Sequence, residues 1–448
     1  MQTPVQTPQC FKSRRDRLLD WMSDQDIGIA ILPTAIPRNR NRDNYYTFRH
    51  DSDFFYLTGF KESEAWLILV AGDTRQSILF CEEKNPEYEI WNGKRWGPQA
   101  AAEHFCFDQA FDVAELNERM PELLIGHQKL LTPLSNFSNQ QLIQKVHDWV
   151  AAAQRKARGA RATPTQWLDL CEPLSEMRLI KDATEIAMMR EAANISAQAH
   201  VRAMQATRPG MREYELEAEL LYMFRKKGAH GVAYDSIVAA GANACVLHHP
   251  AGDSIMQEGE LVLIDAGCEL EGYASDITRT FPVNGRFNGE QRALYEIVLE
   301  AQRQAIAHTS PQHHWNAGHE AAVRVLTQGL LDEGLLKGTL EQALDASAYS
   351  RFYMHRTGHW LGMDVHDVGT YRTPPLGAQE KPWRMLEPNM VLTIEPGLYV
   401  RPADDVPEAF WNIGIRIEDD AVITPQGCEL ITRGVPVEIA EIEMLMKP

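Results

Sequence analysis

The stretch VLIDAGCELEGYASDITRTF, residues 262–281, places an aspartate at the end of an apolar run and a second one eleven positions later. If the chain turns over Leu270–Glu271, the predicted antiparallel register sets Asp265 directly opposite Asp276. Like charges in that position are destabilising unless a proton or a cation lies between them. An exposed surface pair is the alternative, but the apolar run Val262–Ile264 argues for burial. The stretch therefore predicts a metal site or an acid site on a β-hairpin.

The length, net charge and cysteine pattern indicate the general class of protein. The chain has 448 residues, enough for two domains or one large domain, and a formal net charge of −18. That charge opposes nucleic acid or an anionic membrane as the main partner. The seven cysteines are scattered without a CxxC pair, which favours a reducing compartment. The N-terminus lacks the apolar core of a signal peptide, and no apolar run approaches the ~18 residues of a membrane span. We therefore expect a cytoplasmic protein.

The periodicity changes along the chain and predicts two domains. Strands such as IGIAILP (27–33) and AWLILVAGD (65–73) alternate with helices up to about residue 170, which predicts an α/β N-terminal domain over residues 1–172. The segment EPLSEMRLIK (172–181) is the expected connection. Asp182 and Glu185 then have the spacing of a helix-capping box.

The remainder, residues 173–448, is predicted to be an α+β domain with a mainly antiparallel sheet. Its short strands carry acidic or histidine residues and end at glycine or proline. The expected strands are 234–248, 261–266, 274–281, 390–400 and 413–424, and a helical part at about 289–348 interrupts them.

Further metal donors stand in this second half. The segment HRTGHWLGMDVH (355–366) holds three histidines in twelve residues. His355 and His359 would share a face of a helix, as in zinc-binding helices, but Gly358 and Gly362 weaken such a helix. A structural role for each histidine is the alternative.

Two more carboxylates lie on apolar strands. Glu395 follows LTI and precedes a proline, and alternation in GIRIEDDAVIT (414–424) puts Arg416 and Glu418 on one face. Four carboxylates around one point cannot be buried uncompensated, and two divalent ions would neutralise them. Oxygen donors with one imidazole suit manganese, with cobalt, zinc or iron as alternatives. The pattern predicts metal-assisted hydrolysis of an amide.

The order of these donors resembles the dinuclear metallopeptidases of the pita-bread fold, a group that includes methionine aminopeptidases, prolidases and aminopeptidase P. The resemblance implies a creatinase/methionine aminopeptidase-like catalytic domain. It also implies five metal ligands, two of which, Asp276 and Glu418, would be shared by both ions. The five are Asp265, Asp276, His359, Glu395 and Glu418.

The N-terminal half carries the resemblance to one subfamily. The segments RNRDNYYTFRHDSDFFYLTGF (40–60) and IWNGKRWG (90–97) are similar to those of aminopeptidase P. This implies Xaa-Pro aminopeptidase activity, in which a dinuclear-metal-activated hydroxide releases the first residue of a peptide with proline second. It also implies a homo-oligomer, either a dimer or a tetramer.

The resemblance implies further roles. His248 and His366 would stabilise the carbonyl oxygen as it becomes anionic, and His355 would shape the proline pocket. Glu395 would also carry the proton to the leaving nitrogen.

The same resemblance implies contacts around these groups. Arg416 is expected to pair with Tyr399 and with Asp43 of the first domain, and Trp91 to reach a neighbouring subunit's site. Where the family commonly has an aromatic residue after the first histidine, this chain has His249, which we expect to face solvent.

Three alternatives remain open at the level of sequence. Prolidase shares all five ligands but cleaves only Xaa-Pro dipeptides. A catalytically inactive pita-bread binding module should have lost ligands, and a creatinase-like hydrolase is disfavoured by the intact set.

Overall fold

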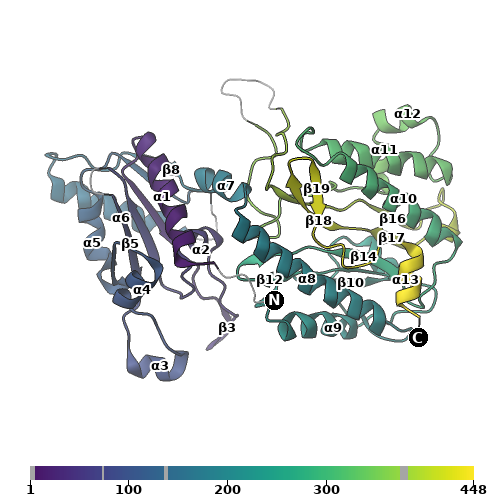
Figure 1. Cartoon of the computed structure of the whole chain (residues 1–448), viewed down its shortest axis with the longest axis horizontal. Helices are drawn as coiled ribbons and strands as arrows, with labels where there is room; N and C mark the ends of the chain where they lie inside the picture. The colour runs from purple at the N-terminus through teal and green to yellow at the C-terminus, as the bar shows by residue number, and fades with distance from the viewer. Residues whose placement is uncertain (1–5, 73–74, 136–139, 374–381, 448) are drawn as a thin grey trace. The chain divides into compact units, whose positions relative to one another are not determined.

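The computed structural model describes residues 6–72, 75–135, 140–373 and 382–447. It contains two compact units, one ending at Met177 and the other beginning at Arg178 (Figure 1). The predicted boundary between residues 172 and 173 falls inside helix α7 (Cys171–Leu179), a few residues before this division. Each unit has its own hydrophobic core. None of the helices within the described ranges is both long and apolar enough to cross a membrane.

The N-terminal unit is built on a mixed six-stranded sheet with the order β6-β5-β4-β1-β7-β8. Strands β1 (Ile29–Pro33) and β4 (Trp66–Val70) are buried along their whole length, which explains why both read as continuous apolar runs rather than alternating ones. The predicted α/β architecture is therefore confirmed. The other strands are β2 (Asn39–Asn41), β3 (Asn44–Tyr45), β5 (Gln76–Cys81), β6 (Gln109–Asp112), β7 (Lys129–Thr132) and β8 (Gln166–Asp169). The helices before α7 are α1 (Pro8–Asp24), α2 (Ser52–Thr58), α3 (Pro86–Asn92), α4 (Pro98–Phe105), η1 (Val113–Glu115), α5 (Leu116–Leu124) and α6 (Gln140–Ala157).

The C-terminal unit begins with α8 (Ala183–Ala206), whose capping box of Asp182 and Glu185 forms as the sequence predicts. Small antiparallel sheets lie between the helix pair α8 and α9 and the pair α10 and α11 (Figure 1). This confirms the predicted α+β class with mainly antiparallel pairing. The remaining helices are α9 (Glu213–Lys226), η2 (Gly241–Cys245), α10 (Gly289–Ala307), α11 (Ala317–Asp332), α12 (Leu340–Asp345), η3 (Ala348–Arg351), η4 (Glu408–Phe410) and α13 (Ile439–Leu445). The strands are β9 (Gly231–Val232), β10 (Ile237–Ala240), β11 (Leu261–Asp265), β12 (Cys268–Leu270), β13 (Tyr273–Ala274), β14 (Thr278–Pro282), β15 (Val391–Ile394), β16 (Gly397–Val400), β17 (Ile413–Arg416), β18 (Asp419–Thr424) and β19 (Gly427–Leu430).

The long strands expected from the sequence are broken, and the breaks coincide with the acidic residues. Asp276 lies between β13 and β14, Glu395 between β15 and β16, and Glu418 between β17 and β18. Asp265 is the last residue of β11. Each carboxylate therefore lies at a point where regular strand pairing ends.

The predicted hairpin register is wrong by two residues. Asp265 is paired with Thr278, not with Asp276, because the turn occupies Glu271 and Gly272. Both turn residues have positive φ, of 49° and 82°, as a tight two-residue hairpin turn requires. A shift by two keeps every side chain on its face, so Asp276 becomes the diagonal neighbour of Asp265 on the same side of the hairpin.

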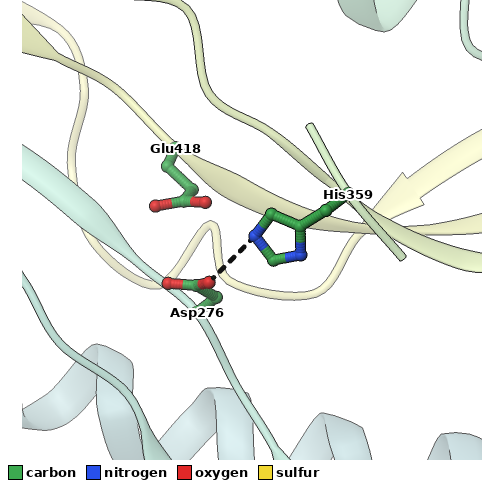
Figure 2. Close-up of side chains that lie close together, drawn as sticks. All are labelled: Asp276, His359 and Glu418. Atoms are coloured by element: carbon green, nitrogen blue, oxygen red, sulfur yellow. Dashed lines mark ion pairs between the residues drawn. The ribbon is translucent and has the colours of Figure 1, made fainter. Parts of the chain in front are cut away.

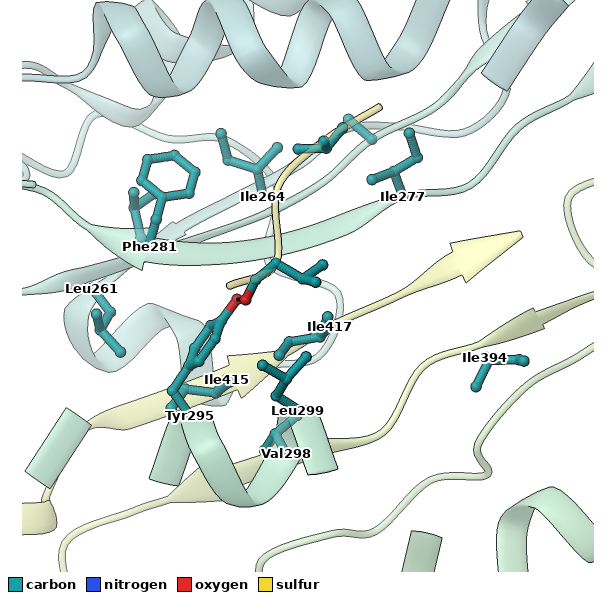
Figure 3. Packing of buried hydrophobic residues seen from close by; sticks show 14 of the residues in the cluster. Leu261, Ile264, Ile277, Phe281, Tyr295, Val298, Leu299, Ile394, Ile415 and Ile417 are labelled. Carbon is teal, nitrogen blue, oxygen red and sulfur yellow. Dashed lines mark hydrogen bonds between the residues drawn. The ribbon is translucent and has the colours of Figure 1, made fainter. Parts of the chain in front are cut away.

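The core behind this face is made by the alternate residues of the same strands. Ile415 and Ile417 are fully buried among apolar side chains, whereas Arg416 and Glu418 line a cavity. Figure 3 shows Tyr295, Val298 and Leu299 of α10 beside these two isoleucines, and Leu261, Ile264 and Phe281 of β11 and β14 belong to the same cluster. The predicted two-residue alternation of the strand after residue 413 is confirmed, and it directs the charged residues away from the core.

The hairpin that carries both aspartates depends on a close backbone approach. A Cβ atom added to Gly267 would lie 1.7 Å from the carbonyl oxygen of Ser275. We expect Gly267→Ala to lower the free energy of unfolding by about 3 kcal/mol or more, because a backbone oxygen cannot move aside as a side chain can. Urea unfolding followed by tryptophan fluorescence measures this change.

The matched control is Gly231→Ala in β9, on the strand paired with Glu269 of the same hairpin. An added Cβ there meets no atom within 4 Å, so the unfolding midpoint should stay close to that of the parent protein. Equal stability of the two variants would contradict the close approach at Gly267.

Candidate metal centre

All five predicted donors line one cavity of about 870 Å³ in the C-terminal unit. The side chains of Asp265, Asp276, His359 and Glu395 expose at most 16% of their surface, and Glu418 is 2% exposed. Loops and strand ends from distant parts of the sequence thus bring four carboxylates and one imidazole to the same buried place.

Three donors are close enough to share one cation. Asp276, His359 and Glu418 each offer a ligand atom, and these atoms all lie within 4.8 Å of one another (Figure 2). His359 Nε2 is 3.4 Å from Asp276 Oδ2 and 3.7 Å from Glu395 Oε1. Its other ring nitrogen, Nδ1, lies 2.9 Å from the carbonyl oxygen of Trp360. That contact fixes the ring orientation and directs Nε2 towards the carboxylates, as metal-binding imidazoles require.

Asp265 is joined to this group by Tyr234. The hydroxyl of Tyr234 is 2.5 Å from Asp265 Oδ1 and also within hydrogen-bond distance of Asp276 Oδ1. Reasoning from the sequence did not identify Tyr234, because a single tyrosine just before a strand has no distinctive spacing. Its hydrogen bonds in the folded chain show that the hydroxyl reaches both aspartates.

Arg416 supplies the main positive charge of the cavity wall. Its Nη2 donates to Asp265 Oδ2 at 2.6 Å, its Nη1 to the hydroxyl of Tyr399 at 2.9 Å, and its Nε to Thr278 Oγ1 at 3.1 Å. Thr278 in turn donates to Glu418 Oε2 at 2.6 Å. One guanidinium therefore orients an aspartate directly and a glutamate through a hydroxyl group. The expected contact between Arg416 and Asp43 of the N-terminal unit stays a prediction.

The carboxylates cannot all be ionised in the absence of cations. Burial, together with the neighbouring acids, raises the pKa of Asp276 to about 6 and that of Glu418 well above its usual range. Burial raises the pKa of Glu395 to about 7, although His359 and Arg416 act in the opposite direction. For Asp265, burial would raise the pKa, but Arg416 lowers it below the usual value.

His359 responds to the same charges. Burial alone would lower its pKa, but Asp276 and Glu395 raise it to about 9. A set of buried oxygen donors that retains protons, with one imidazole beside it, fits divalent cations, because the cations replace the protons and remove the repulsion.

The other predicted histidines lie around the donors. His248, His355 and His366 all line the cavity. The ring centroids of His359 and His366 are 4.1 Å apart, and His355 Nε2 is 2.8 Å from the hydroxyl of Tyr399. Residues 355–366 form irregular loops rather than a helix, so the histidines do not share a helix face. The glycines in that segment explain the loop: a Cβ on Gly358 would lie 2.1 Å from the carbonyl oxygen of Thr393.

The expectation that His249 faces solvent is wrong. His249 Nε2 lies 2.9 Å from Glu213 Oε2, and Glu213 is fully buried. The same carboxylate accepts hydrogen bonds from the backbone N–H groups of Ala240 and Gly252 and from the Asn243 amide. Glu213 thus holds both ends of the loop that presents His248 to the cavity, and the sequence offered no signal for this long-range contact.

Trp91 belongs to the other unit. It lies in helix α3 with 86% of its surface exposed. Its expected place in a neighbouring subunit's site stays a prediction.

Comparisons with known proteins agree with this geometry. Residues 187–425 match the family model described as metallopeptidase family M24, and residues 11–131 match the aminopeptidase P N-terminal domain. The Xaa-Pro aminopeptidase of Haemophilus influenzae is 42% identical over 437 residues, covering 97% of this chain and 96% of the relative. The Xaa-Pro aminopeptidase of Escherichia coli is 42% identical over 441 residues, covering 98% and 97%.

A solved structure extends the likeness to the whole fold. Aminopeptidase PepP of Pseudomonas aeruginosa superimposes with a TM-score of 0.95 at 47% identity, covering 99% of this chain and 98% of that one. The two predicted domain types, an aminopeptidase P N-terminal domain and a pita-bread catalytic domain, are therefore both present. The matched family models, the full-length relatives and the shared structure together show that this chain belongs to the aminopeptidase P group of metallopeptidase family M24.

Proposed function

We propose that this protein hydrolyses the first peptide bond of peptides whose second residue is proline. The observation that carries the proposal is the gathering of five metal donors in one cavity of a chain that aligns with Xaa-Pro aminopeptidases over nearly its whole length. An Xaa-Pro bond is a tertiary amide without an N–H group, so a site that grips a backbone N–H cannot select it. A metal centre needs only the carbonyl oxygen and the free amine of the substrate.

The cofactor we propose is a pair of divalent ions, with manganese as the first choice. Asp265, Asp276, His359, Glu395 and Glu418 would hold them, with Asp276 and Glu418 shared. When bound, such a pair polarises the substrate carbonyl and activates water as a nucleophile. Cobalt, zinc or iron would suit the same donors.

The chain's own residues then have separate tasks. Glu395 accepts a proton from the attacking water and passes it to the leaving nitrogen. His248 and His366 donate hydrogen bonds to the carbonyl oxygen as negative charge develops there. His355, hydrogen-bonded to Tyr399, forms part of the wall for the proline ring. Arg416 keeps Asp265 and Tyr399 in position through its two guanidinium contacts.

Three parts of the proposal concern the surroundings of the site. Asp43 and Trp91 would complete it from the N-terminal unit and from a neighbouring subunit, in a dimer or tetramer. The cytoplasm is the proposed compartment. A longer peptide is proposed as the substrate rather than a dipeptide, because the relatives that match nearly the whole chain are Xaa-Pro aminopeptidases.

A peptide assay tests the function directly. With manganese present, we expect release of the first residue from Ala-Pro-Ala and no measurable cleavage of Ala-Ala-Ala, because the pocket is shaped for the ring. Chromatography of the released amino acid measures both rates. Cleavage of the dipeptide Ala-Pro alone would identify a prolidase instead, and binding of Ala-Pro-Ala without cleavage would indicate a binding module.

The shared-ligand assignment is tested by Asp276→Asn. The change removes a carboxylate oxygen and a negative charge, so we expect kcat to fall by more than about 100-fold. Manganese content, measured by elemental analysis, should fall below that of the parent protein. Asp235→Asn is the control, because Asp235 lines the same cavity but is exposed and lies outside the donor cluster. Normal turnover and full metal content in the Asp276 variant would contradict the assignment.

Proton release gives a pH test of the cation site. Asp276 and Glu395 have raised pKa values, of about 6 and 7, in the metal-free protein. The folded metal-free state therefore holds more protons than the unfolded state over this range, and its stability falls as the pH rises through it. His359, with a pKa raised to about 9, changes stability in the same direction.

Metal binding displaces these protons and should be favoured by rising pH. We expect the Kd for manganese to decrease at least about tenfold between pH of about 5.5 and about 7.5, as one displaced proton requires. Titration calorimetry in two buffers of different ionisation enthalpy counts the protons released. An affinity that does not change with pH would contradict the protonated state of the carboxylates.

A further inference from the structure

The cavity has a second guanidinium group, besides that of Arg416, whose role the hydrolytic reaction leaves unassigned. Of the described residues that line it, five are acidic, and two, Arg356 and Arg416, carry a guanidinium group. Arg416 already forms an ion pair with Asp265 at 2.6 Å. Arg356 is exposed, and among the described residues no carboxylate forms an ion pair with it. A cation in this position is available to an anionic part of a ligand.

The Arg356 side chain is nevertheless held in place. Its Nη2 donates to Asn316 Oδ1, and its guanidinium carbon lies 5.2 Å from the ring centroid of Trp383. The guanidinium carbon of Arg372 lies 3.6 Å from the centroid of the same indole ring. Arg372 and Trp383 are also bridged through their backbones. Two guanidinium groups are thus collected at one aromatic side chain by cation–π attraction.

Such an arrangement is complementary to a carboxylate. A guanidinium presents parallel N–H donors that match the two oxygens of a carboxylate, and an indole ring that holds it reduces the loss of side-chain freedom on binding. The acidic donors line the same cavity, so its lining carries both negative and positive groups.

A short peptide carries the complementary charges, an ammonium group at one end and a carboxylate at the other. We propose that Arg356, held beside Trp383, binds the C-terminal carboxylate of tripeptide substrates, one residue beyond the proline. This assigns a preference for short free-acid peptides and rests on the proposed Xaa-Pro aminopeptidase function. The ammonium end then faces the acidic donors, where the first residue is released.

The test compares Ala-Pro-Ala as the free acid with Ala-Pro-Ala amide. The parent protein should show a kcat/KM roughly tenfold higher for the acid, the size expected of a hydrogen-bonded charge pair. In Arg356→Gln this preference should vanish, through a higher KM for the acid and an unchanged kcat for both peptides. Arg356→Lys, which keeps the charge but not the planar fork, should retain part of it.

Arg351→Gln is the matched control, because Arg351 stands five positions earlier, is exposed and pairs with Asp405 at 2.6 Å rather than lining the cavity. It should keep the full preference for the acid. Equal kcat/KM values for the two peptides in the parent protein, or an equal loss for both in Arg356→Gln, would overturn the proposal. The proposed function would stand in either case as long as Ala-Pro-Ala is cleaved.

A binding measurement separates the two proposals completely. In the Asp276→Asn background, calorimetry with the two peptides measures affinity without turnover. The acid should bind roughly tenfold more tightly than the amide, and additional Arg356→Gln should remove the difference. Equal affinities for acid and amide in the Asp276→Asn protein would refute carboxylate recognition, whether or not the parent protein cleaves Xaa-Pro peptides.

Discussion

The repulsion among four buried carboxylates is the constraint on which the catalytic unit depends. Arg416 neutralises one of them through its 2.6 Å pair with Asp265, and the remaining three retain protons or require cations. The pKa values of Asp276, Glu395 and Glu418 are raised for the same reason, because ionisation of each would add a negative charge to the buried cluster. Divalent cations bind favourably in such a cavity, because they supply the positive charge that neutralises the carboxylates.

The fold meets this constraint by separating faces within single strands. Ile415 and Ile417 enter the apolar core while Arg416 and Glu418 line the cavity. In the run Glu418-Asp419-Asp420, neighbouring side chains face different surroundings. Asp419 turns into the core and pairs with Arg279 at 2.8 Å, and Asp420 accepts the backbone N–H of Asp276 at 3.1 Å. Three consecutive acids thus serve the cavity, the core and the neighbouring hairpin.

Close backbone contacts at two glycines fix the positions of neighbouring donors. The close approaches at Gly267 and Gly358 leave no room for a Cβ atom, and each lies within two residues of a donor. Glu213 acts in the same sense on the loop of His248, by accepting hydrogen bonds from both ends of it. Functional side chains in this protein are therefore positioned mainly by loops that are tied to a rigid sheet and helices.

The sequence by itself determined the classes of the two domains and the capping of the helix after Asp182, because these follow from local periodicity and residue chemistry. It also singled out the acidic strand ends as candidate donors, while the full set of five was implied by the resemblance to a known family. The tertiary structure alone decided the hairpin register, the bridge from Tyr234 to both aspartates, the pairing of His249 with Glu213 and the place of Arg356 beside Trp383. Each of these contacts depends on a turn geometry or joins residues far apart in the chain. The periodicity of hydrophobic residues, two for a strand and 3.6 for a helix, reports only local structure. It carries no information about such contacts, because they depend on how separate segments pack.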